Sequence, residues 1–495
     1  MNSQRMEETE TKPSFNSSNT VKGIEEDGRS ASPRWCNLEL SLGTEAETFQ
    51  LEKAVCSHGL FMMAPNYWDP LSKTLTRPLR LSLVEDDYSS TSSSGSVIVS
   101  ISQPAEPPSS LSVHVHGTQK LSPQEEHALL AQVSRMLRLS EREMKAVREF
   151  RKMSNHYRDG KDSSFNGRVF RSPTLFEDMV KCILLCNCQW SRTLSMAQAL
   201  CELQLELQNE SYPSSFAKAA LTVSGSPKVE TEKFIPNTPA GKEPKRKLRV
   251  SGVSRKVNFI ERDSELEADA KLDSTLLPTD INTDASQHCK SREATETLNK
   301  DGSLLQFSNG KASCAHGHIG NFPSPKELAN LDESFLAKRC KLGYRANRIL
   351  ELAQAIAEGR LQLKKLEELC KDANLSSYDQ LSDQLKEIKG FGPFTRANVL
   401  MCMGYYHVIP TDSETIRHLK QVHSRKSTSQ TVQKDVEKFY GRYEPYQFLA
   451  YWSEIWDFYE RSFGKMNKMP ASEYKLITAS NMRSVRGTSK RKKIS

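Results

Sequence analysis

The stretch EIKGFGPFTRANVL, Glu387–Leu400, places two glycines one residue apart between two apolar segments. The residues before it, 377–388, repeat leucine and isoleucine at helical spacing, and Ser377 with Gln380 is predicted to form a capping box. The residues after it, 394–404, are apolar almost all round, which is typical of a buried helix. We therefore predict two helices joined by a tight turn.

Gly390 and Gly392 permit backbone conformations with positive φ, which bring main-chain N–H groups to the surface. The turn also precedes a helix, and the free N–H groups and dipole at a helix N-terminus favour an anion. With the charge of Lys389 beside them, the two glycines are candidates for a phosphate-binding turn. A plain joint between two core helices explains the same residues, and the hairpin alone favours that interpretation.

A second motif, HVIPTDSETIRHLK, holds an aspartate 20 residues beyond Gly392. Pro410 ends the preceding element, and Thr411 with Glu414 is predicted to form a capping box, so Asp412 lies at a helix start. There the helix dipole is expected to lower the pKa of the carboxyl and keep it ionised. Asp412 is either a helix-capping acid, which is common, or a fixed anion close to the phosphate-binding turn.

Only 37% of the 495 residues are hydrophobic, whereas a fully folded chain would approach half. We therefore expect folded domains interrupted by long disordered segments. The net charge of +8 permits a polyanionic partner. The N-terminus lacks the apolar region of a secretory signal, and no apolar run predicts a membrane span. The 11 cysteines are expected to be free thiols in a reducing compartment.

Composition shifts divide the chain into ordered and disordered parts. Short β-branched runs such as GSVIVSIS (95–102) and LSVHVHG (111–117) indicate a small antiparallel sheet, and 49–70 is predicted as strands and turns within it. Ser122, ahead of a proline and a first-turn glutamate, marks the start of the first helix. The predicted parts are a disordered segment (1–45), an N-terminal β domain (46–120), a first helical part (121–207), a disordered insertion (208–320), a second helical part with the hairpin (321–465) and a basic tail (466–495).

The order of these motifs resembles the helix–hairpin–helix (HhH-GPD) DNA glycosylase superfamily. Its signature is a helix, a GxG hairpin, a second helix and then a V/I-P-x-D segment, here Ile409–Asp412, at the spacing found in this chain. The stretch 54–70 and the strands after it resemble the N-terminal domain of the 8-oxoguanine and 3-methyladenine II glycosylases. The segments that resemble other family helices are Phe170–Trp190, Leu342–Leu350 and Tyr443–Glu460.

The resemblance implies a mainly α fold, with a two-part helical domain, a small N-terminal antiparallel β-sheet domain and long disordered segments. It implies a base-excision repair enzyme that flips a damaged base, an alkylated or oxidised purine, out of double-stranded DNA. Asp412 is the implied catalytic carboxylate, which stabilises the cationic sugar and orients water. Family members that also cut the strand carry a lysine where Phe394 stands here, and a phenyl ring forms no Schiff base. A monofunctional hydrolase is therefore expected.

The resemblance also implies which residues contact DNA. The DNA-binding candidates are Lys389, Gly390, Phe391, Gly392, Thr395 and Asn187, and the base-pocket candidates are Tyr451, Ile455 and Phe394. Asn187 stands with Cys186 where the family usually has two glutamines. Its side chain either fills the gap left by a flipped base or simply ends a helix.

No metal or cofactor is expected from the sequence. Cys182, Cys186 and Cys188 lack a CxxC pair and are interpreted as helix thiols. Some glycosylases hold an iron–sulfur cluster with cysteines after the catalytic aspartate, and the last cysteine here is Cys402, so no such cluster is expected. The two histidines within 111–117 are interpreted as an exposed strand face rather than a metal site.

Two basic clusters are interpreted as nuclear import signals, although a solvated charge run explains them as well. They comprise Lys245, Arg246 and Lys247, and Lys490, Arg491, Lys492 and Lys493. We expect a monomeric nuclear enzyme whose partner is double-stranded DNA with a damaged base. The alternative is a non-catalytic relative that binds DNA without removing a base.

Overall fold

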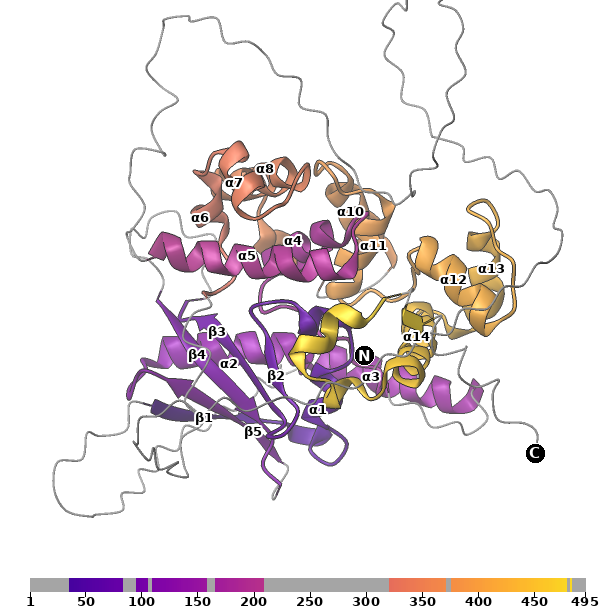
Figure 1. The fold of residues 1–495 in the computed structure, drawn as a ribbon. Helices are drawn as coiled ribbons and strands as arrows, with labels where there is room; N and C mark the ends of the chain where they lie inside the picture. The colour runs from indigo at the N-terminus through magenta and orange to yellow at the C-terminus, as the bar shows by residue number, and fades with distance from the viewer. Residues whose placement is uncertain are drawn as a thin grey trace, which may run out of the picture. The chain divides into compact units, whose positions relative to one another are not determined.

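The computed structural model describes residues 35–82, 95–105, 109–157, 165–208, 320–370, 375–478 and 481–482. The interior of the predicted insertion, both basic clusters and the first 34 residues lie outside these ranges. Within them the chain is mainly helical with a small N-terminal antiparallel sheet, which confirms the predicted fold class (Figure 1). None of the described helices is long and apolar enough to cross a membrane. The nine described cysteines are free thiols.

Five strands form one antiparallel sheet in the order β1-β5-β4-β3-β2. Side chains alternate between its two faces, so Val113 and Val115 are fully buried while His114 and His116 are half-buried on the other face. Helix α2 (Pro123–Leu137) packs against β1 and β3. The strands are β1 (Trp35–Ser41), β2 (Tyr67–Asp69), β3 (Thr74–Arg80), β4 (Ser96–Ser102) and β5 (Ser110–His116).

Strand β1 corrects the predicted end of the first disordered segment at residue 45. Residues 35–41 pair with β5 along their whole length, and Leu38 and Leu40 point into the core while their neighbours are exposed. The alternation in WCNLELS is short and follows a long polar segment. Averaging composition over a window therefore conceals it.

The stretch 49–70, predicted as short strands and turns, contains turns and one strand but also two short helices. Helix α1 (Leu51–Val55) and the 3₁₀ helix η2 (Gly59–Met62) precede β2, which is the only strand within this stretch. The buried side chains of α1 recur at helical spacing. Strand propensity is a weak guide here because packing against neighbouring elements overrides it.

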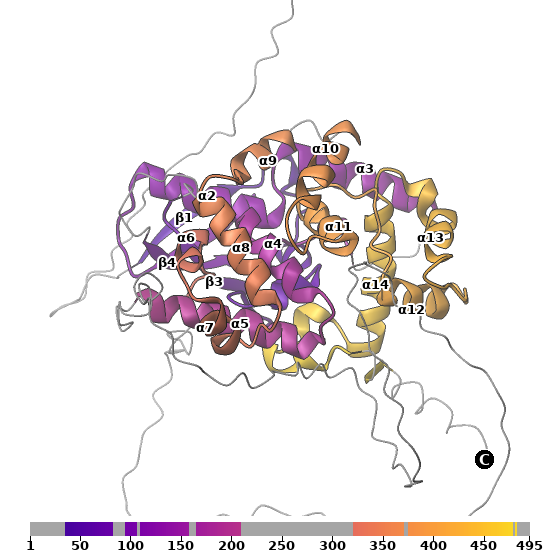
Figure 2. The ribbon, with the colours of Figure 1, turned by 90° about the horizontal axis from the view of Figure 1, so that it is seen from above.

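The helical part surrounds α4, which lies among α5, α8 and α11 (Figure 2) and is buried at every position from Leu175 to Leu184. Ser122 is the predicted start of α2, and it forms a capping box there with Glu125. Helix α10 begins at Leu375 instead of Ser377, whose buried hydroxyl contacts the Tyr405 hydroxyl at 2.9 Å, so the capping box predicted there is wrong. The helices that follow α2 are α3 (Glu141–Tyr157), α4 (Leu175–Leu185), α5 (Trp190–Gln208), α6 (Pro325–Ala329), α7 (Glu333–Arg339), α8 (Arg345–Ala357), α9 (Leu363–Leu369), α10 (Leu375–Lys386), α11 (Pro393–Cys402), α12 (Ser413–Val422), α13 (Val432–Tyr440) and α14 (Gln447–Phe463).

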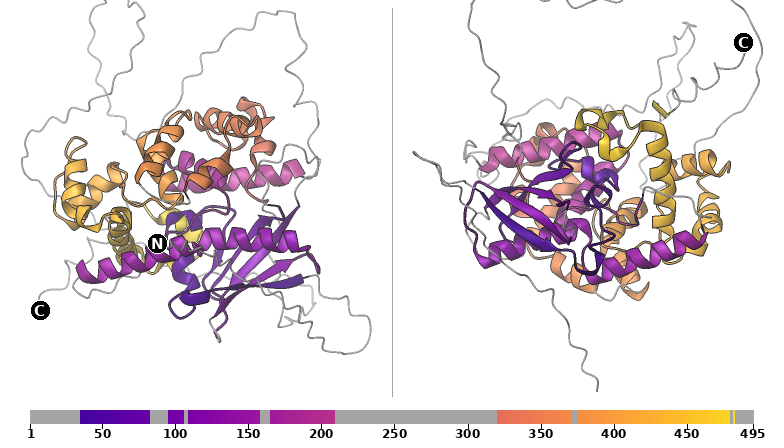
Figure 3. Two further views of the ribbon diagram at one scale, coloured as in Figure 1. Left: turned by 180° about the vertical axis from the view of Figure 1, so that it is seen from behind. Right: turned by 90° about the horizontal axis from the view of Figure 1, so that it is seen from below.

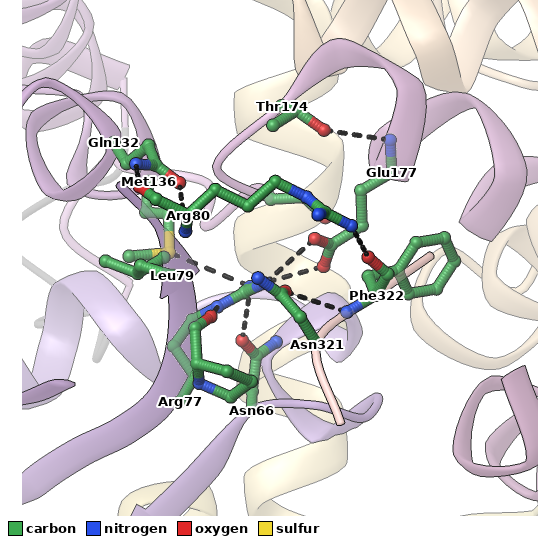
Figure 4. A network of polar contacts seen from close by, with 12 residues as sticks. Asn66, Arg77, Leu79, Arg80, Gln132, Met136, Thr174, Glu177, Asn321 and Phe322 are labelled. Atoms are coloured by element: carbon green, nitrogen blue, oxygen red, sulfur yellow. Dashed lines mark hydrogen bonds and ion pairs between the residues drawn. The ribbon is translucent and has the colours of Figure 1, made fainter. Parts of the chain in front are cut away.

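A buried ion-pair network joins β3, α4 and the segment that follows residue 320 (Figure 4). Arg77 on β3 donates to both carboxylate oxygens of Glu177 on α4, at 3.2 and 2.8 Å, and Lys181 pairs with the same carboxylate at 2.7 Å. Arg80 donates to the carbonyl oxygen of Phe322 at 2.9 Å. Burial raises the pKa of Glu177, but the charges of Arg77 and Lys181 outweigh it and hold the pKa at about 2. The network thus ties both helical parts to the sheet.

Helices α12, α13 and α14 lie together at the end of the helical domain away from the sheet (Figures 1 and 3). Helix α3 reaches them, because the rings of Phe150 and Tyr446 pack edge to face at 6.4 Å between centroids. Tyr446 also donates a hydrogen bond to Glu149. The first helical part therefore supports the helices that carry the motif around Asp412.

Candidate active site

The hairpin between α10 and α11 contains one glycine with positive φ and one without. Gly390 has φ +87°, and a Cβ there would lie 2.4 Å from Cδ of Arg348, so a larger residue would be strained and would displace that side chain. Gly392 has φ −66° and ψ 178°, which is extended backbone, and it is the N-cap of α11. The prediction of positive φ is therefore right for Gly390 and wrong for Gly392.

The start of α11 carries main-chain donors that the protein does not use. In the described part of the chain, the N–H groups of Gly392, Phe394 and Thr395 have no hydrogen-bond partner, and Pro393 has no N–H. Nothing lies within 4 Å of the place that a Cβ on Gly392 would take. Free donors at a helix N-terminus beside open space are the geometry that suits an anion.

The cationic side chains near this turn are partly engaged within the protein. Lys389 is exposed, and its Nζ pairs with Glu351 at 2.6 Å. Arg348 packs against Gly390 and lies over the ring of Tyr344 at 4.7 Å. The turn therefore has two basic neighbours, one of which is already paired with a carboxylate.

Two of the predicted DNA-binding residues have buried side chains. Phe391 is 3% exposed and Thr395 is 2% exposed. The Thr395 hydroxyl lies 3.1 Å from Sγ of Cys186 and 3.4 Å from the carbonyl oxygen of Gly390, so it fastens the hairpin to the end of α4. These side chains hold the turn in place. The N–H of Phe391 donates to the carbonyl oxygen of Ile388, so the main-chain N–H of Thr395 is the donor that remains for an external partner.

Asn187 lies in the exposed loop between α4 and α5, with φ +46°. Its carbonyl oxygen accepts a hydrogen bond from Nη2 of Arg345 at 3.2 Å. The carbonyl oxygen of Cys186 accepts another from the Tyr344 hydroxyl at 3.2 Å. The start of α8 therefore holds the loop backbone and leaves the Asn187 side chain at the surface.

Asp412 is itself the N-cap of α12, which corrects the capping box predicted for Thr411 and Glu414. Its Oδ1 accepts from the N–H and the hydroxyl of Thr415, at 2.9 and 3.0 Å. The hydroxyl of Thr415 also lies 2.9 Å from the hydroxyl of Tyr451. Thr415 therefore fixes the carboxylate through one oxygen.

The pKa of Asp412 is raised above its ordinary value, contrary to the prediction. Burial of the carboxyl raises it, and the hydrogen bonds from Thr415 only partly offset that effect. The helix start supplies the expected donor, but desolvation outweighs it. No lysine or arginine pairs with Asp412 in the described ranges, and no side chain there donates a hydrogen bond to its Oδ2; the main-chain N–H of Glu414 also lowers the pKa of the carboxyl.

Asp412 lies in the wall of a cavity of about 230 Å³. That volume is several times the roughly 30 Å³ that one water molecule occupies in the liquid. Phe394 and Tyr451 line it as predicted, whereas Ile455 is fully buried and is not among the lining residues within the described ranges. Most of the lining is aromatic or apolar. The aromatic members are Trp190, Phe394, Phe448, Tyr451, Trp452, Trp456 and Tyr459.

Sequence reasoning missed the N-terminal wall of this cavity, which His58 and its neighbours through Met63 form. Nδ1 of His58 accepts from the N–H of Leu60 at 3.4 Å, and the ring packs on Trp452 at 4.4 Å between centroids. Burial, with a smaller contribution from Arg138, lowers the pKa of His58 to about 3, so the imidazole is neutral at physiological pH. No periodic pattern in the sequence marks this wall. Its residues belong to the stretch 49–70, which was predicted as strands and turns.

A second carboxylate in the wall, Glu414, is engaged by other side chains. It pairs with Arg417 and accepts a hydrogen bond from the hydroxyl of Tyr459 at 2.6 Å. Asp412 is therefore the lining carboxylate with an oxygen left free for a ligand, within the part of the chain that the structure describes.

Known family models do not match the chain, and neither does any curated protein sequence. Solved structures similar to it include a 3-methyladenine DNA-glycosylase from Archaeoglobus fulgidus, at 13% identity and a TM-score of 0.41, which covers 85% of this chain and 98% of that one. Another is an 8-oxoguanine glycosylase/lyase from Clostridium acetobutylicum, at 12% identity and a TM-score of 0.36, which covers 79% of this chain and 98% of that one. MBOgg1 in complex with a low-affinity DNA ligand, at 14% identity and a TM-score of 0.36, gives the same coverage.

Proposed function

We propose that the protein is a DNA glycosylase that removes a damaged base from double-stranded DNA by hydrolysis. The observation that carries the proposal is the carboxylate of Asp412, which pairs with no lysine or arginine among the described residues, in the wall of an aromatic cavity. The free N–H groups at the start of α11, the helix that contributes Phe394 to the same cavity, give a place for a backbone phosphate. The order of the sequence motifs supports the same conclusion.

The arrangement suits each step of base removal. A base that leaves the stack would insert among the aromatic rings of the cavity. The free Oδ2 of Asp412 would then face the sugar, where a carboxylate stabilises the oxocarbenium-like transition state and orients the attacking water. Thr415 keeps Oδ1 occupied and so fixes the direction of Oδ2.

We propose a monofunctional enzyme, because the cavity offers no amine nucleophile. No lysine is among its lining residues in the described ranges, and Phe394 occupies the position where a lysine would stand. A Schiff base with the abasic sugar, and the strand cleavage that follows from it, would therefore be absent.

The apolar, aromatic cavity fits an alkylated or oxidised purine. We further propose that the enzyme acts as a monomer in the nucleus, where the basic clusters at 245–247 and 490–493 would direct it. The alternative, a relative that binds DNA without chemistry, rests on the departure at Cys186 and Asn187 from the family's glutamine pair.

The test is a base-release assay on duplexes that carry single alkylated, oxidised or deaminated bases. Hot alkali cleaves every abasic site, so strand breaks that appear only after alkali report hydrolysis without lyase activity. Base release by the wild-type protein, lost in Asp412→Asn, would support the proposal. DNA binding by both proteins with no release from any substrate would favour the alternative.

A further inference from the structure

Helices α12, α13 and α14 bring two histidines, a glutamate and a tyrosine together outside the cavity. His418 lies in α12 and His423 directly follows it, Tyr440 ends α13, and Glu454 lies in α14. Nε2 of His418 and Nε2 of His423 lie 3.2 and 2.8 Å from Oε2 of Glu454. We propose that His418, His423 and Glu454 bind a divalent transition-metal cation of the zinc type, with Tyr440 beside the fourth position.

More short contacts join the polar atoms of this cluster than these atoms have protons to bridge. The Tyr440 hydroxyl lies 2.6 Å from Oε2 of Glu454 and 3.0 and 3.1 Å from the two Nε2 atoms, so four atoms make five short contacts. These atoms carry at most three protons, one on the hydroxyl and one on each Nε2. A cation would let both imidazoles and the carboxylate direct a lone pair at one centre. The proton of each imidazole would then lie on Nδ1, which in His418 is buried without a hydrogen-bond partner among the described residues.

The donor set and the two Nε2–Oε2 separations suit a metal site, whereas the two Nε2 atoms, which lie within 4.8 Å of each other, would also have to reach the spacing of such a site. The ligand atoms of His418, His423 and Glu454 all lie within 4.8 Å of one another. Tetrahedral zinc with bonds of about 2.0–2.1 Å holds its ligand atoms roughly 3.3–3.4 Å apart. The observed Nε2–Oε2 separations of 3.2 and 2.8 Å need to widen by a few tenths of an ångström. Two imidazoles with one carboxylate are a common zinc donor set, in which the fourth position stays open.

The surroundings hold the ligands and leave the site open to solvent on one side. The side chain of His418 is 1% exposed, whereas those of His423 and Glu454 are 19% and 26% exposed. His423 stacks on Phe439 at 4.2 Å between centroids, and His418 packs edge-on against Tyr451 at 5.3 Å. Both rings are therefore oriented by aromatic neighbours, and an ion can enter from the solvent side.

Glu454 would supply the negative charge of the site. An ionised carboxylate is the form that binds a cation.

A bound cation would clamp α12 to α14 and would bring α13 against both. The N-cap of α12 is Asp412, so the clamp would brace the helix that carries the proposed catalytic carboxylate. The metal would have a structural role, and its binding does not depend on whether the protein removes a base.

The test uses the purified full-length chain, stripped with a chelator and titrated with Zn²⁺ or Co²⁺. The variants are His423→Gln, whose side chain is partly exposed, and Glu454→Gln; the control is His156→Gln, at an exposed position on α3. Zinc can also bind elsewhere on a chain with 11 cysteines and 11 histidines, so the readout is the difference between proteins. Circular dichroism establishes that each variant is folded.

We expect the wild type and the control to bind one equivalent more than either variant, and zinc to raise their Tm further than that of the variants. The additional equivalent of Co²⁺ that the wild type binds should show visible d–d bands without a sulfur-to-metal charge-transfer band, because no cysteine belongs to the site. Equal stoichiometry and equal Tm response in folded His423→Gln and wild type would overturn the proposal. The cluster would then be a hydrogen-bond network only. If His423→Gln does not fold, the same comparison with Glu454→Gln decides the question.

Discussion

The two hairpin glycines have different surroundings, so their alanine variants separate the structural role of the turn from its proposed role in DNA binding. At Gly390 an alanine would have to adopt φ near +87° and displace the Arg348 side chain. Backbone strain of this kind costs on the order of 1–3 kcal/mol. Gly390→Ala should therefore lower the free energy of unfolding by about 1–3 kcal/mol from backbone strain, and further through the displacement of Arg348.

At Gly392 the backbone is extended and the space for a Cβ is empty, so alanine fits. Alanine restricts the unfolded chain more than glycine does, which raises the free energy of unfolding by about 0.4–1 kcal/mol. Alanine is also a poorer N-cap than glycine, which lowers it by a similar amount, roughly 0.5–1 kcal/mol. The two effects nearly cancel, and Gly392→Ala should unfold close to the wild type. A methyl group beside the free N–H groups would nevertheless keep a phosphate away.

A hydrogen bond to a charged group contributes about 1.5–3 kcal/mol, so loss of the phosphate contact should weaken binding roughly ten- to hundredfold. The assays are urea unfolding and fluorescence anisotropy with a duplex at one fixed salt concentration, because affinity depends on salt. If Gly392→Ala is stable and binds duplex DNA like the wild type, the hairpin is only a joint between helices and the phosphate-binding argument is refuted.

Three further predictions concern the carboxylates and the cavity wall. Asp412 must be ionised to act, and its pKa is already raised. Thr415→Val removes a hydrogen bond that lowers this pKa, so it should move the acid limb of the pH profile of base release to higher pH. An unmoved limb would contradict the assignment. Glu177→Gln leaves Arg77 and a neighbouring lysine buried without their counter-charge and should cost about 3–5 kcal/mol in urea unfolding. The pKa of Glu177 is depressed from 4.5 to about 2, so its contribution to the free energy of unfolding is present above about pH 4.5 and is lost as the pH falls towards 2. Acid unfolding that is insensitive to Glu177→Gln would contradict the assignment. Phe394→Lys should introduce borohydride-trappable cleavage of abasic sites, whereas strong cleavage by the unmodified protein would contradict the monofunctional proposal.

Long periodic segments and capping signals made much of the fold predictable. The helix start at Ser122 and the strands β4 and β5 follow from local pattern, and the structure confirms them. Strand β1 and the short helices of 49–70 could not be found this way. Their segments are too short for periodicity to outweigh composition, and packing against distant elements decides their conformation.

The site was predictable where a motif carries it and unpredictable where it is assembled from distant segments. Asp412, Phe394 and Tyr451 line one cavity, as the motif order suggested. The pKa of Asp412 was predicted in the wrong direction, because burial by residues far away in sequence outweighs the local helix start. His58 belongs to the same wall, yet nothing in the sequence indicated that the stretch around it lines the cavity.

The most direct test of the account compares the wild type with Asp412→Asn on the same damaged duplexes, measuring base release under single-turnover conditions and binding by anisotropy. The account predicts that both proteins bind with similar Kd and that the variant releases the base at least about 10²-fold more slowly, since removing a group that stabilises developing charge typically costs that much. Equal release rates for the two proteins would contradict the assignment of Asp412 as the catalytic carboxylate.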